Sequence, residues 1–221
     1  MENKVIVCLA GQKRSGKDSV GSVLKSEGFE QMALADSLRE LCSVAFEIPL
    51  NVFTDDNLKE NPFERPILLK PDHLAIIESI VEKEWGFVID PYCHGRLLSC
   101  LETELKHPRH ILQYVGTELL RSNIDDQIFL KVADKKISEC SKDIVITDCR
   151  FSNEREWFRK KGATICLVKR PSLAVSKDTH ASENDLGEDK DYDVIITNDS
   201  DLNQLKLNVS MWINMTFRRR R

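Results

Sequence analysis

The stretch that decides the fold is Lys4-Val-Ile-Val-Cys-Leu-Ala10, followed directly by Gly11-Gln-Lys-Arg-Ser-Gly-Lys-Asp-Ser19. The first part is a short apolar run rich in Val and Ile, which is typical of a buried strand. The second part matches G-x-x-x-x-G-K, and apolar residues at helical spacing begin right after it. A strand, a glycine loop and a helix in this order are the context that a phosphate-binding loop requires.

The composition of this loop explains how it would hold a triphosphate. Glycines let the backbone turn so that successive N–H groups face inward, and the helix start adds the positive end of a dipole. Lys17 supplies a cation for the β- and γ-phosphates of ATP. An ordinary glycine turn is the alternative, and the strand and helix on either side argue against it. The predicted ATP-binding residues are Gly11, Lys13, Arg14, Ser15, Gly16, Lys17, Asp18 and Ser19.

One position departs from the usual phosphate loop. Asp18 follows Lys17, where Ser or Thr usually ligates Mg²⁺, and Ser19 comes one residue later. We expect Asp18 or Ser19 to reach the metal, directly or through water, and the sequence does not decide between them. Asp148 ends a second apolar run, Ile144–Thr147, and its carboxylate is predicted to orient Mg²⁺ or its waters. Taken alone, an Asp at a strand end is more often a helix cap.

Short apolar runs alternate with amphipathic segments along the rest of the chain. Strands are expected within residues 4–10, 29–34, 143–147, 163–168 and 194–197. Helices are expected between them, including one from Asp36 to Pro49. Residues 50–70 look irregular and residues 86–106 are ambiguous. The alternation predicts an α/β, P-loop NTPase-like three-layer sandwich, with a mainly parallel central sheet and helices on both faces.

Composition excludes several classes of protein. The chain has 221 residues, 41% of them hydrophobic, which argues against a disordered chain. Its 32 basic and 36 acidic residues give a net charge of −4, so direct nucleic-acid binding is not expected. No apolar run approaches the length of a membrane span. Seven scattered cysteines indicate reduced thiols and a cytoplasmic location.

Transfer of phosphate between two anions needs cations around both the donor and the acceptor. Arginine suits this task because its planar fork binds phosphate oxygens bidentately. Seven arginines lie near loops or helix ends of the predicted map: Arg14, Arg39, Arg65, Arg109, Arg121, Arg150 and Arg170. For each one alone, a solvated surface arginine is the commoner explanation. The chain lacks an N-K-x-D motif, which weakens a GTPase interpretation.

Several segments together resemble the deoxynucleoside monophosphate kinases of tailed bacteriophages. They are the phosphate loop, Arg109-His-Ile-Leu-Gln-Tyr-Val-Gly-Thr-Glu118, Ile146-Thr-Asp-Cys-Arg150, Val168-Lys-Arg-Pro171, Asp178-Thr-His180 with Glu183, and Ile195-Ile-Thr-Asn-Asp199. Their order and approximate spacing also agree, and the match is loosest between residues 48 and 106.

The resemblance implies a single P-loop kinase domain over residues 1–221, with residues of about 48–106 as an acceptor-binding insertion. It implies transfer of the γ-phosphate of ATP to a deoxynucleoside monophosphate, with Mg²⁺ present. The implied acceptor-binding residues are Arg39, Arg65, Arg109, Gln113, Gly116 and Thr117. The predicted catalytic residues are Arg14, Lys17, Asp148 and Arg150, and the predicted metal residues are Asp18, Ser19 and Asp148.

Two other functions stay open at this point. Animal phosphomevalonate kinases resemble the chain in the S-G-K-D loop and the T-D-x-R turn, although the L-Q-x-x-G-T-E segment favours nucleotide kinases. A nucleotide-dependent switch that holds ATP without transfer is the third reading, and the arginines beyond the phosphate loop argue against it. Small-molecule nucleotides are the expected partners, no membrane is involved, and a homodimer is left open. If the chain is viral, its location is the host cytoplasm.

Overall fold

The apolar run that opens the chain forms strand β1 (Ile6–Ala10) in the computed structural model, which describes residues 4–173 and 186–217. The chain divides into two units. Unit 1 comprises Met1–Leu34 and Lys135–Arg221, and unit 2 comprises Ala35–Asp134. The predicted insertion over about 48–106 falls inside unit 2. The segment Asp178–His180 with Glu183, quoted above, lies outside the described residues.

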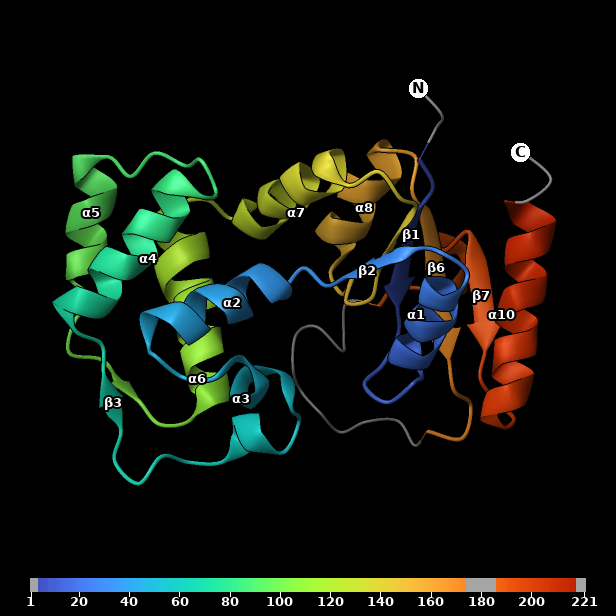
Figure 1. Cartoon of the computed structure of the whole chain (residues 1–221), viewed down its shortest axis with the longest axis horizontal. Coiled ribbons are helices and arrows are strands. Elements are labelled where there is room, and N and C mark those ends of the chain that lie inside the picture. The colour runs from blue at the N-terminus through green and yellow to red at the C-terminus, as the bar shows by residue number, and fades with distance from the viewer. Residues whose placement is uncertain (1–3, 174–185, 218–221) are drawn as a thin grey trace. The chain divides into compact units, whose positions relative to one another are not determined.

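Unit 1 is built on a five-stranded sheet with β1 in its centre (Figure 1). The order is β2-β5-β1-β6-β7, and every neighbouring pair is parallel. The other strands are β2 (Glu30–Met32), β5 (Ile144–Ile146), β6 (Thr164–Lys169) and β7 (Val194–Thr197). Each lies where the sequence predicts a strand. Their carboxyl ends meet at one edge of the sheet, where parallel α/β sheets bind ligands.

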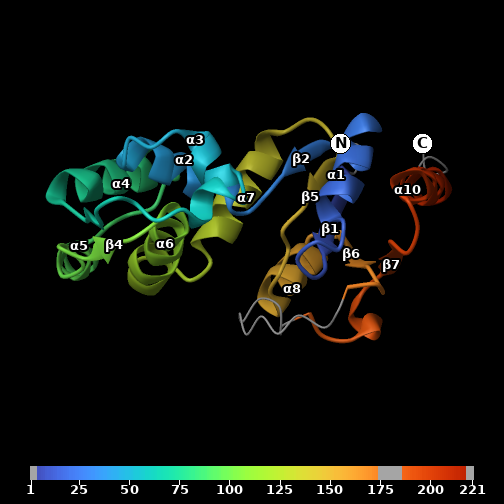
Figure 2. The ribbon, with the colours of Figure 1, turned by 90° about the horizontal axis from the view of Figure 1, so that it is seen from below.

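Helices cover both faces of this sheet. Because side chains alternate along a strand, Val7 and Leu9 point to one face, where they pack against α1 (Lys17–Ser26) and α10 (Leu202–Thr216). Helix α8 (Ser152–Lys160) lies on the opposite side of the sheet from α1 (Figure 2). This arrangement confirms the predicted α/β sandwich with a parallel sheet. No helix within residues 4–173 or 186–217 is long and apolar enough to cross a membrane.

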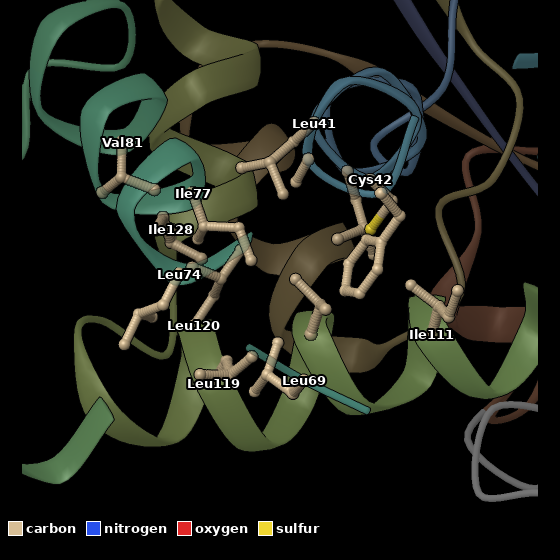
Figure 3. Packing of buried hydrophobic residues seen from close by; sticks show 14 of the residues in the cluster. Leu41, Cys42, Leu69, Leu74, Ile77, Val81, Ile111, Leu119, Leu120 and Ile128 are labelled. Carbon is tan, nitrogen blue, oxygen red and sulfur yellow. The ribbon is translucent and has the colours of Figure 1, made fainter. Parts of the chain in front are cut away.

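Unit 2 is mainly helical and has its own apolar core. Its helices are α2 (Asp36–Ala45), α3 (Leu50–Thr54), α4 (Pro71–Lys83), α5 (Pro91–Leu98), α6 (Pro108–Gln113) and the π-helix η2 (Tyr114–Arg121). Helix α7 (Ile128–Glu139) runs from unit 2 into unit 1. Leu41, Ile77 and Leu119 are fully buried in the core of unit 2 (Figure 3). This core rests on the apolar stripes that the sequence predicts for α2, α4 and α6.

Several local predictions in unit 2 were wrong. Helix α2 ends at Ala45 rather than at Pro49, and Pro49 is instead the N-cap of α3. Asp36 is the first helical residue and not the cap. Residues 50–70 and 86–106 are more ordered than expected, because they contain α3, the 3₁₀ turn η1 (Leu58–Glu60), α5, and an antiparallel pair of short strands, β3 (Ile67–Leu68) and β4 (Glu104–Leu105). Except for α5, which has eight residues, these elements have only two to five residues and are too short to show a hydrophobic period.

The surroundings of two histidines in unit 2, His73 and His110, lead us to expect that this unit loses stability at acidic pH. The Nδ1 atoms of His73 and His110 accept backbone N–H bonds from Lys70 (3.2 Å) and Lys106 (3.3 Å). Partial burial, with nearby positive charge as a smaller cause, lowers the pKa of both imidazoles from the ordinary 6.5. Both imidazoles therefore bind a proton at a higher pH in the unfolded chain than in the folded protein. As a result, the free energy of unfolding falls as the pH drops from 6.5 to the lower pKa of the folded state.

Chemical denaturation at several values of pH between about 7.5 and 5 measures this effect. The variant His73→Asn/His110→Asn keeps a side-chain acceptor at both positions and removes the proton. We expect its free energy of unfolding to fall less over this range than that of the wild type. Equal pH dependence in the two proteins would show that neither histidine contributes.

Candidate active site

The predicted phosphate loop lies at the carboxyl end of β1. Gly11 (φ 146°), Arg14 (φ 66°) and Gly16 (φ 102°) all have positive φ, a region that favours glycine. Helix α1 begins at Lys17 with Gly16 as its N-cap, so the last turn of the loop runs straight into the helix start. The strand, loop and helix that the sequence predicts are therefore confirmed as local structure.

The base of the loop is crowded. A Cβ on Gly11 would lie 2.4 Å from the carbonyl oxygen of Val168 in β6 and 2.8 Å from Oγ of Ser15, so no larger residue fits without moving backbone. Ser15 is 1% exposed, and its Oγ has no hydrogen-bond partner within the described part of the chain. A buried hydroxyl without a partner costs about 1–3 kcal/mol, which makes it a candidate contact for an oxygen of a ligand.

Lys17 lies across the start of the loop. Its Nζ donates to the carbonyl oxygens of Gly11 (2.6 Å) and Gln12 (2.7 Å). The ammonium group is therefore held at the phosphate loop, at the position from which the sequence predicts it to act. Lys13 and Arg14, also predicted to bind ATP, are exposed.

The residues predicted to face Mg²⁺ supply oxygen donors. Asp18 is exposed in the first turn of α1, and Ser19 is half-buried beside it. Within residues 4–173 and 186–217, no three His, Cys, Asp or Glu side chains gather into a metal-binding group. Mg²⁺ is usually held by one or two carboxylates together with substrate phosphates, so Asp18, Ser19 and Asp148 fit a hard cation that arrives with a nucleotide.

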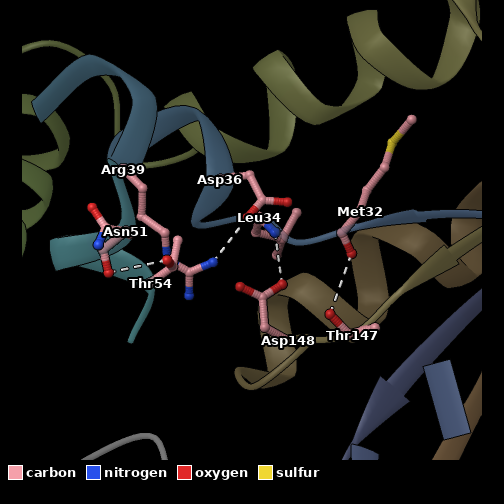
Figure 4. A network of polar contacts seen from close by, with 8 residues as sticks. All are labelled: Met32, Leu34, Asp36, Arg39, Asn51, Thr54, Thr147 and Asp148. Carbon is pink, nitrogen blue, oxygen red and sulfur yellow. Dashed lines mark hydrogen bonds and ion pairs between the residues drawn. The ribbon is translucent and has the colours of Figure 1, made fainter. Parts of the chain in front are cut away.

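Asp148 is fixed at the same edge of the sheet as the phosphate loop. It follows β5, which pairs with β1, and its Oδ1 accepts the backbone N–H of Leu34 at 2.6 Å (Figure 4). The N–H of Cys149 donates to the carbonyl of Leu9 at 3.2 Å, which ties the loop after β5 to the end of β1. Asp148 thus joins the loop after β5 to the segment that leads from β2 into α2.

The main chain of Arg150 is held from both sides by two buried charged residues of α8. Oε2 of Glu154 accepts the N–H groups of Arg150 (2.8 Å) and Phe151 (3.0 Å). A guanidinium N–H of Arg155 donates to the carbonyl of Arg150 at 2.9 Å. Glu154 and Arg155 are each only 5% exposed, whereas the side chain of Arg150 is exposed. Neither residue was predicted from the sequence, although a carboxylate at the third helical position is a known capping signal.

Asn198 is a third residue of this region that was not predicted from the sequence. It follows β7, and its Nδ2 donates to the carbonyl oxygen of Ser15 at 3.0 Å. The two residues are 183 positions apart in the chain. Only the pairing of β6 with β7 brings Asn198 to the edge where the phosphate loop lies.

Unit 2 carries the arginines that the sequence predicts to hold the acceptor. Arg39, in the first turns of α2, pairs with Asp36 at 2.8 Å (Figure 4), and its Nε is buried without a hydrogen-bond partner among the described residues. Arg109, in the first turn of α6, pairs with Glu60 at 2.5 Å. Arg65 is exposed in the loop before β3. Two of the three arginines are therefore held in place by carboxylates of their own unit.

The predicted residues of α6 and η2 fall on two sides of one continuous helix. Gln113 and Thr117 follow Arg109 at intervals of four residues, and both are exposed. Gly116 is buried, and a Cβ there would lie 2.8 Å from Cδ2 of Leu38, so it lets η2 approach α2 closely. Arg109, Gln113 and Thr117 share one side, while Gly116 has a packing role. The π-helical turn itself is rare in proteins and occurs frequently at functional sites.

Comparison with known proteins finds deoxynucleotide monophosphate kinases that are similar to this chain. The family model described as deoxynucleotide monophosphate kinase matches residues 101–209. The chain is 28% identical over 214 residues to a putative deoxynucleotide monophosphate kinase of Acanthamoeba polyphaga mimivirus, a match that covers 90% of this chain and 91% of that protein.

Two phage proteins match a shorter part of the chain. The deoxynucleotide monophosphate kinase of Enterobacteria phage T4 is 33% identical over 101 residues, 44% of this chain and 41% of that protein. The deoxynucleoside-5'-monophosphate kinase of Escherichia phage T5 is 31% identical over 109 residues, 46% of this chain and 44% of that protein. These alignments span less than half of each phage protein. The chain is thus similar to deoxynucleotide monophosphate kinases of viruses, over nine tenths of its length in the mimivirus protein and over less than half of it in the two phage proteins.

Proposed function

We propose that this chain transfers the γ-phosphate of ATP to a deoxynucleoside 5'-monophosphate, giving ADP and the deoxynucleoside diphosphate. The observation that carries the proposal is the phosphate loop at the carboxyl end of β1, with Lys17 held across it, in a chain whose relatives are named deoxynucleotide monophosphate kinases. Each half of the reaction is assigned to its own unit, the donor to unit 1 and the acceptor to unit 2.

In the proposed reaction, binding of ATP depends on positive groups that are already held at the phosphate loop before the nucleotide binds. The glycine loop of residues 11–17 and the start of α1 are assigned to the phosphates of ATP, and Lys17 and Arg150 would add positive charge where negative charge develops during transfer. Mg²⁺, held by Asp148 with Asp18 or Ser19, would supply further charge neutralisation when it is bound with the nucleotide. Positioning and electrostatics of this kind account for most of the catalysis in phosphoryl transfer.

The acceptor half rests on the arginines of unit 2. Arg39, Arg65 and Arg109 are assigned to the acceptor monophosphate, and the exposed side that Gln113 and Thr117 share with Arg109 is assigned to the rest of the nucleotide. The buried Nε of Arg39 leaves one donor for a phosphate oxygen. The attacking oxygen of the acceptor is already anionic near pH 7, so direct in-line transfer needs no general base.

The partners we propose are free nucleotides. The net charge of −4 and the absence of a wide positive field argue against nucleic acid as a partner. The scattered unpaired cysteines support a cytoplasmic location, that of the host if the chain is viral. A homodimer stays a prediction that sedimentation equilibrium tests.

The experiment that tests the function is ADP release from ATP, measured with and without each of the four deoxynucleoside monophosphates. Strong stimulation by at least one of them supports the proposal. Stimulation by phosphomevalonate alone would make the chain a phosphomevalonate kinase. Slow ADP release that no acceptor stimulates would make it an ATP-binding switch.

The acceptor assignment predicts a separate result for Arg109. Replacement by Ala removes charge-assisted hydrogen bonds to the acceptor phosphate, so we expect the KM for the monophosphate to rise about 10- to 100-fold while the KM for ATP stays unchanged. Arg96→Ala is the matched control, since Arg96 is exposed on α5 and donates to the carbonyl of Ser122. Equal effects of the two substitutions would remove Arg109 from the acceptor site.

A further inference from the structure

Asn198 connects the last strand of the sheet to the phosphate loop. Its backbone N–H donates to the carbonyl of Lys169 at the end of β6 (2.7 Å), so its main chain is fixed by the sheet. Its side-chain Nδ2 donates to the carbonyl oxygen of Ser15, a residue of the phosphate loop, at 3.0 Å. The sheet therefore holds the carbonyl of Ser15 through Asn198, in a loop where Gly11 and Gly16 have positive φ.

The bond to Ser15 fixes the direction of an N–H group. The carbonyl of Ser15 and the N–H of Gly16 belong to the same planar peptide unit and point in opposite directions. While Asn198 holds this carbonyl, the N–H of Gly16 is held in the opposite direction, away from the side chain of Asn198. An N–H group facing inward is what a loop needs in order to cradle phosphate oxygens.

The fit between Asn198 and Gly16 provides a second observation. A Cβ on Gly16 would lie 2.5 Å from Nδ2 of Asn198, so the amide packs directly against the Cα of this glycine. Gly16 also has φ 102°, a conformation that side chains disfavour. Gly16, the second glycine of the motif, is thus required for two reasons: a side chain there would collide with Asn198, and its positive φ favours glycine.

We propose that Asn198 is a positioning residue, which holds the Ser15–Gly16 peptide in the orientation that binds the phosphates of ATP. The proposal rests on the proposed function, in which this loop binds the donor. Asn198 acts through the loop, so its loss reduces affinity for the donor nucleotide and leaves the acceptor half of the reaction as it is.

The sharpest variant is Asn198→Asp, which keeps the size of the side chain. It replaces the donating Nδ2 by an oxygen that faces the carbonyl of Ser15, so the peptide loses its anchor. We expect the dissociation constants of ATP and ADP, measured by calorimetry, to rise at least ~10-fold, and those in Asn198→Ala to rise less. The KM for the deoxynucleoside monophosphate should stay unchanged.

Asn208→Asp is the matched control. Asn208 is exposed on α10, and its Oδ1 accepts a bond from Gln204 at 2.9 Å, which an aspartate keeps. The control adds the same negative charge to the same unit and should bind ATP as the wild type does. It therefore separates loss of the bond to Ser15 from a general effect of charge.

Three outcomes decide the matter. Weaker nucleotide binding in Asn198→Asp, with wild-type binding in Asn208→Asp, supports the proposal. A lower melting temperature with unchanged ATP affinity would show a purely structural role and overturn it, as would equal effects of both aspartates. Calorimetry needs no turnover, so a wild-type protein that binds ATP but phosphorylates no monophosphate refutes the proposed function and leaves the role of Asn198 to be decided by these variants.

Discussion

Lys17→Met is expected to lower turnover at least ~100-fold, the scale on which removal of one preorganised charge contact acts. The ammonium group lies across the phosphate loop on the carbonyls of Gly11 and Gln12, and no other residue of α1 places a cation at the helix start. Methionine keeps the aliphatic length of the side chain and removes the charge. Initial rates of ADP formation at saturating ATP and acceptor measure the loss.

The control for this substitution lies on the same helix. Lys25 is exposed in the last turn of α1, so Lys25→Met removes one charge at the far end of the helix from the loop. It should keep wild-type turnover, and both variants should retain the thermal unfolding transition of the wild type. Near-normal turnover of Lys17→Met would remove this lysine from the mechanism.

Glu154→Ala is expected to have the second-largest effect, because two partly buried N–H groups lose their acceptor at once. Each unsatisfied N–H costs about 1–3 kcal/mol, so the free energy of unfolding should fall by about 2–4 kcal/mol. The same change releases the main chain of Arg150, and we expect kcat to fall about 10- to 100-fold with the KM for ATP little changed. Denaturant unfolding and steady-state kinetics measure the two losses separately.

Glu154→Gln separates a positioning role from a purely structural one. The amide oxygen of glutamine still accepts the bonds from Arg150 and Phe151, so most of kcat and most of the stability should return. Arg155→Lys tests the other side, where one guanidinium N–H holds the carbonyl of Arg150. A Glu154→Ala protein that is less stable but turns over normally would show that the position of Arg150 does not matter for transfer.

The parts of the site that follow from local sequence could be predicted. The phosphate loop depends on two glycines and a lysine at fixed spacing between a strand and a helix, and the structure has that strand, loop and helix. Four of the five strands were evident as short apolar runs, because strands covered on both faces carry Val and Ile almost without interruption, whereas β2 is the polar stretch Glu30–Met32.

What could not be predicted depends on residues that are distant in sequence or on elements too short to have a period. Asn198 is an ordinary polar residue after a strand until the sheet places it beside Ser15. The pairing of Ile67 with Leu105 brings together two-residue strands from segments that looked irregular or ambiguous. Gly116 looked like a residue of the acceptor pocket, and its packing against Leu38 became visible only once α2 and η2 were placed together.

The most direct test of the account follows a labelled phosphate. Wild-type protein is mixed with ATP labelled at the γ-phosphate and with one deoxynucleoside monophosphate that stimulates ADP release, and the products are separated. The account predicts that the label moves to the β-phosphate of the deoxynucleoside diphosphate in step with ADP formation, and that Lys17→Met abolishes most of this transfer. Label recovered only as inorganic phosphate, with the monophosphate unchanged, would contradict it.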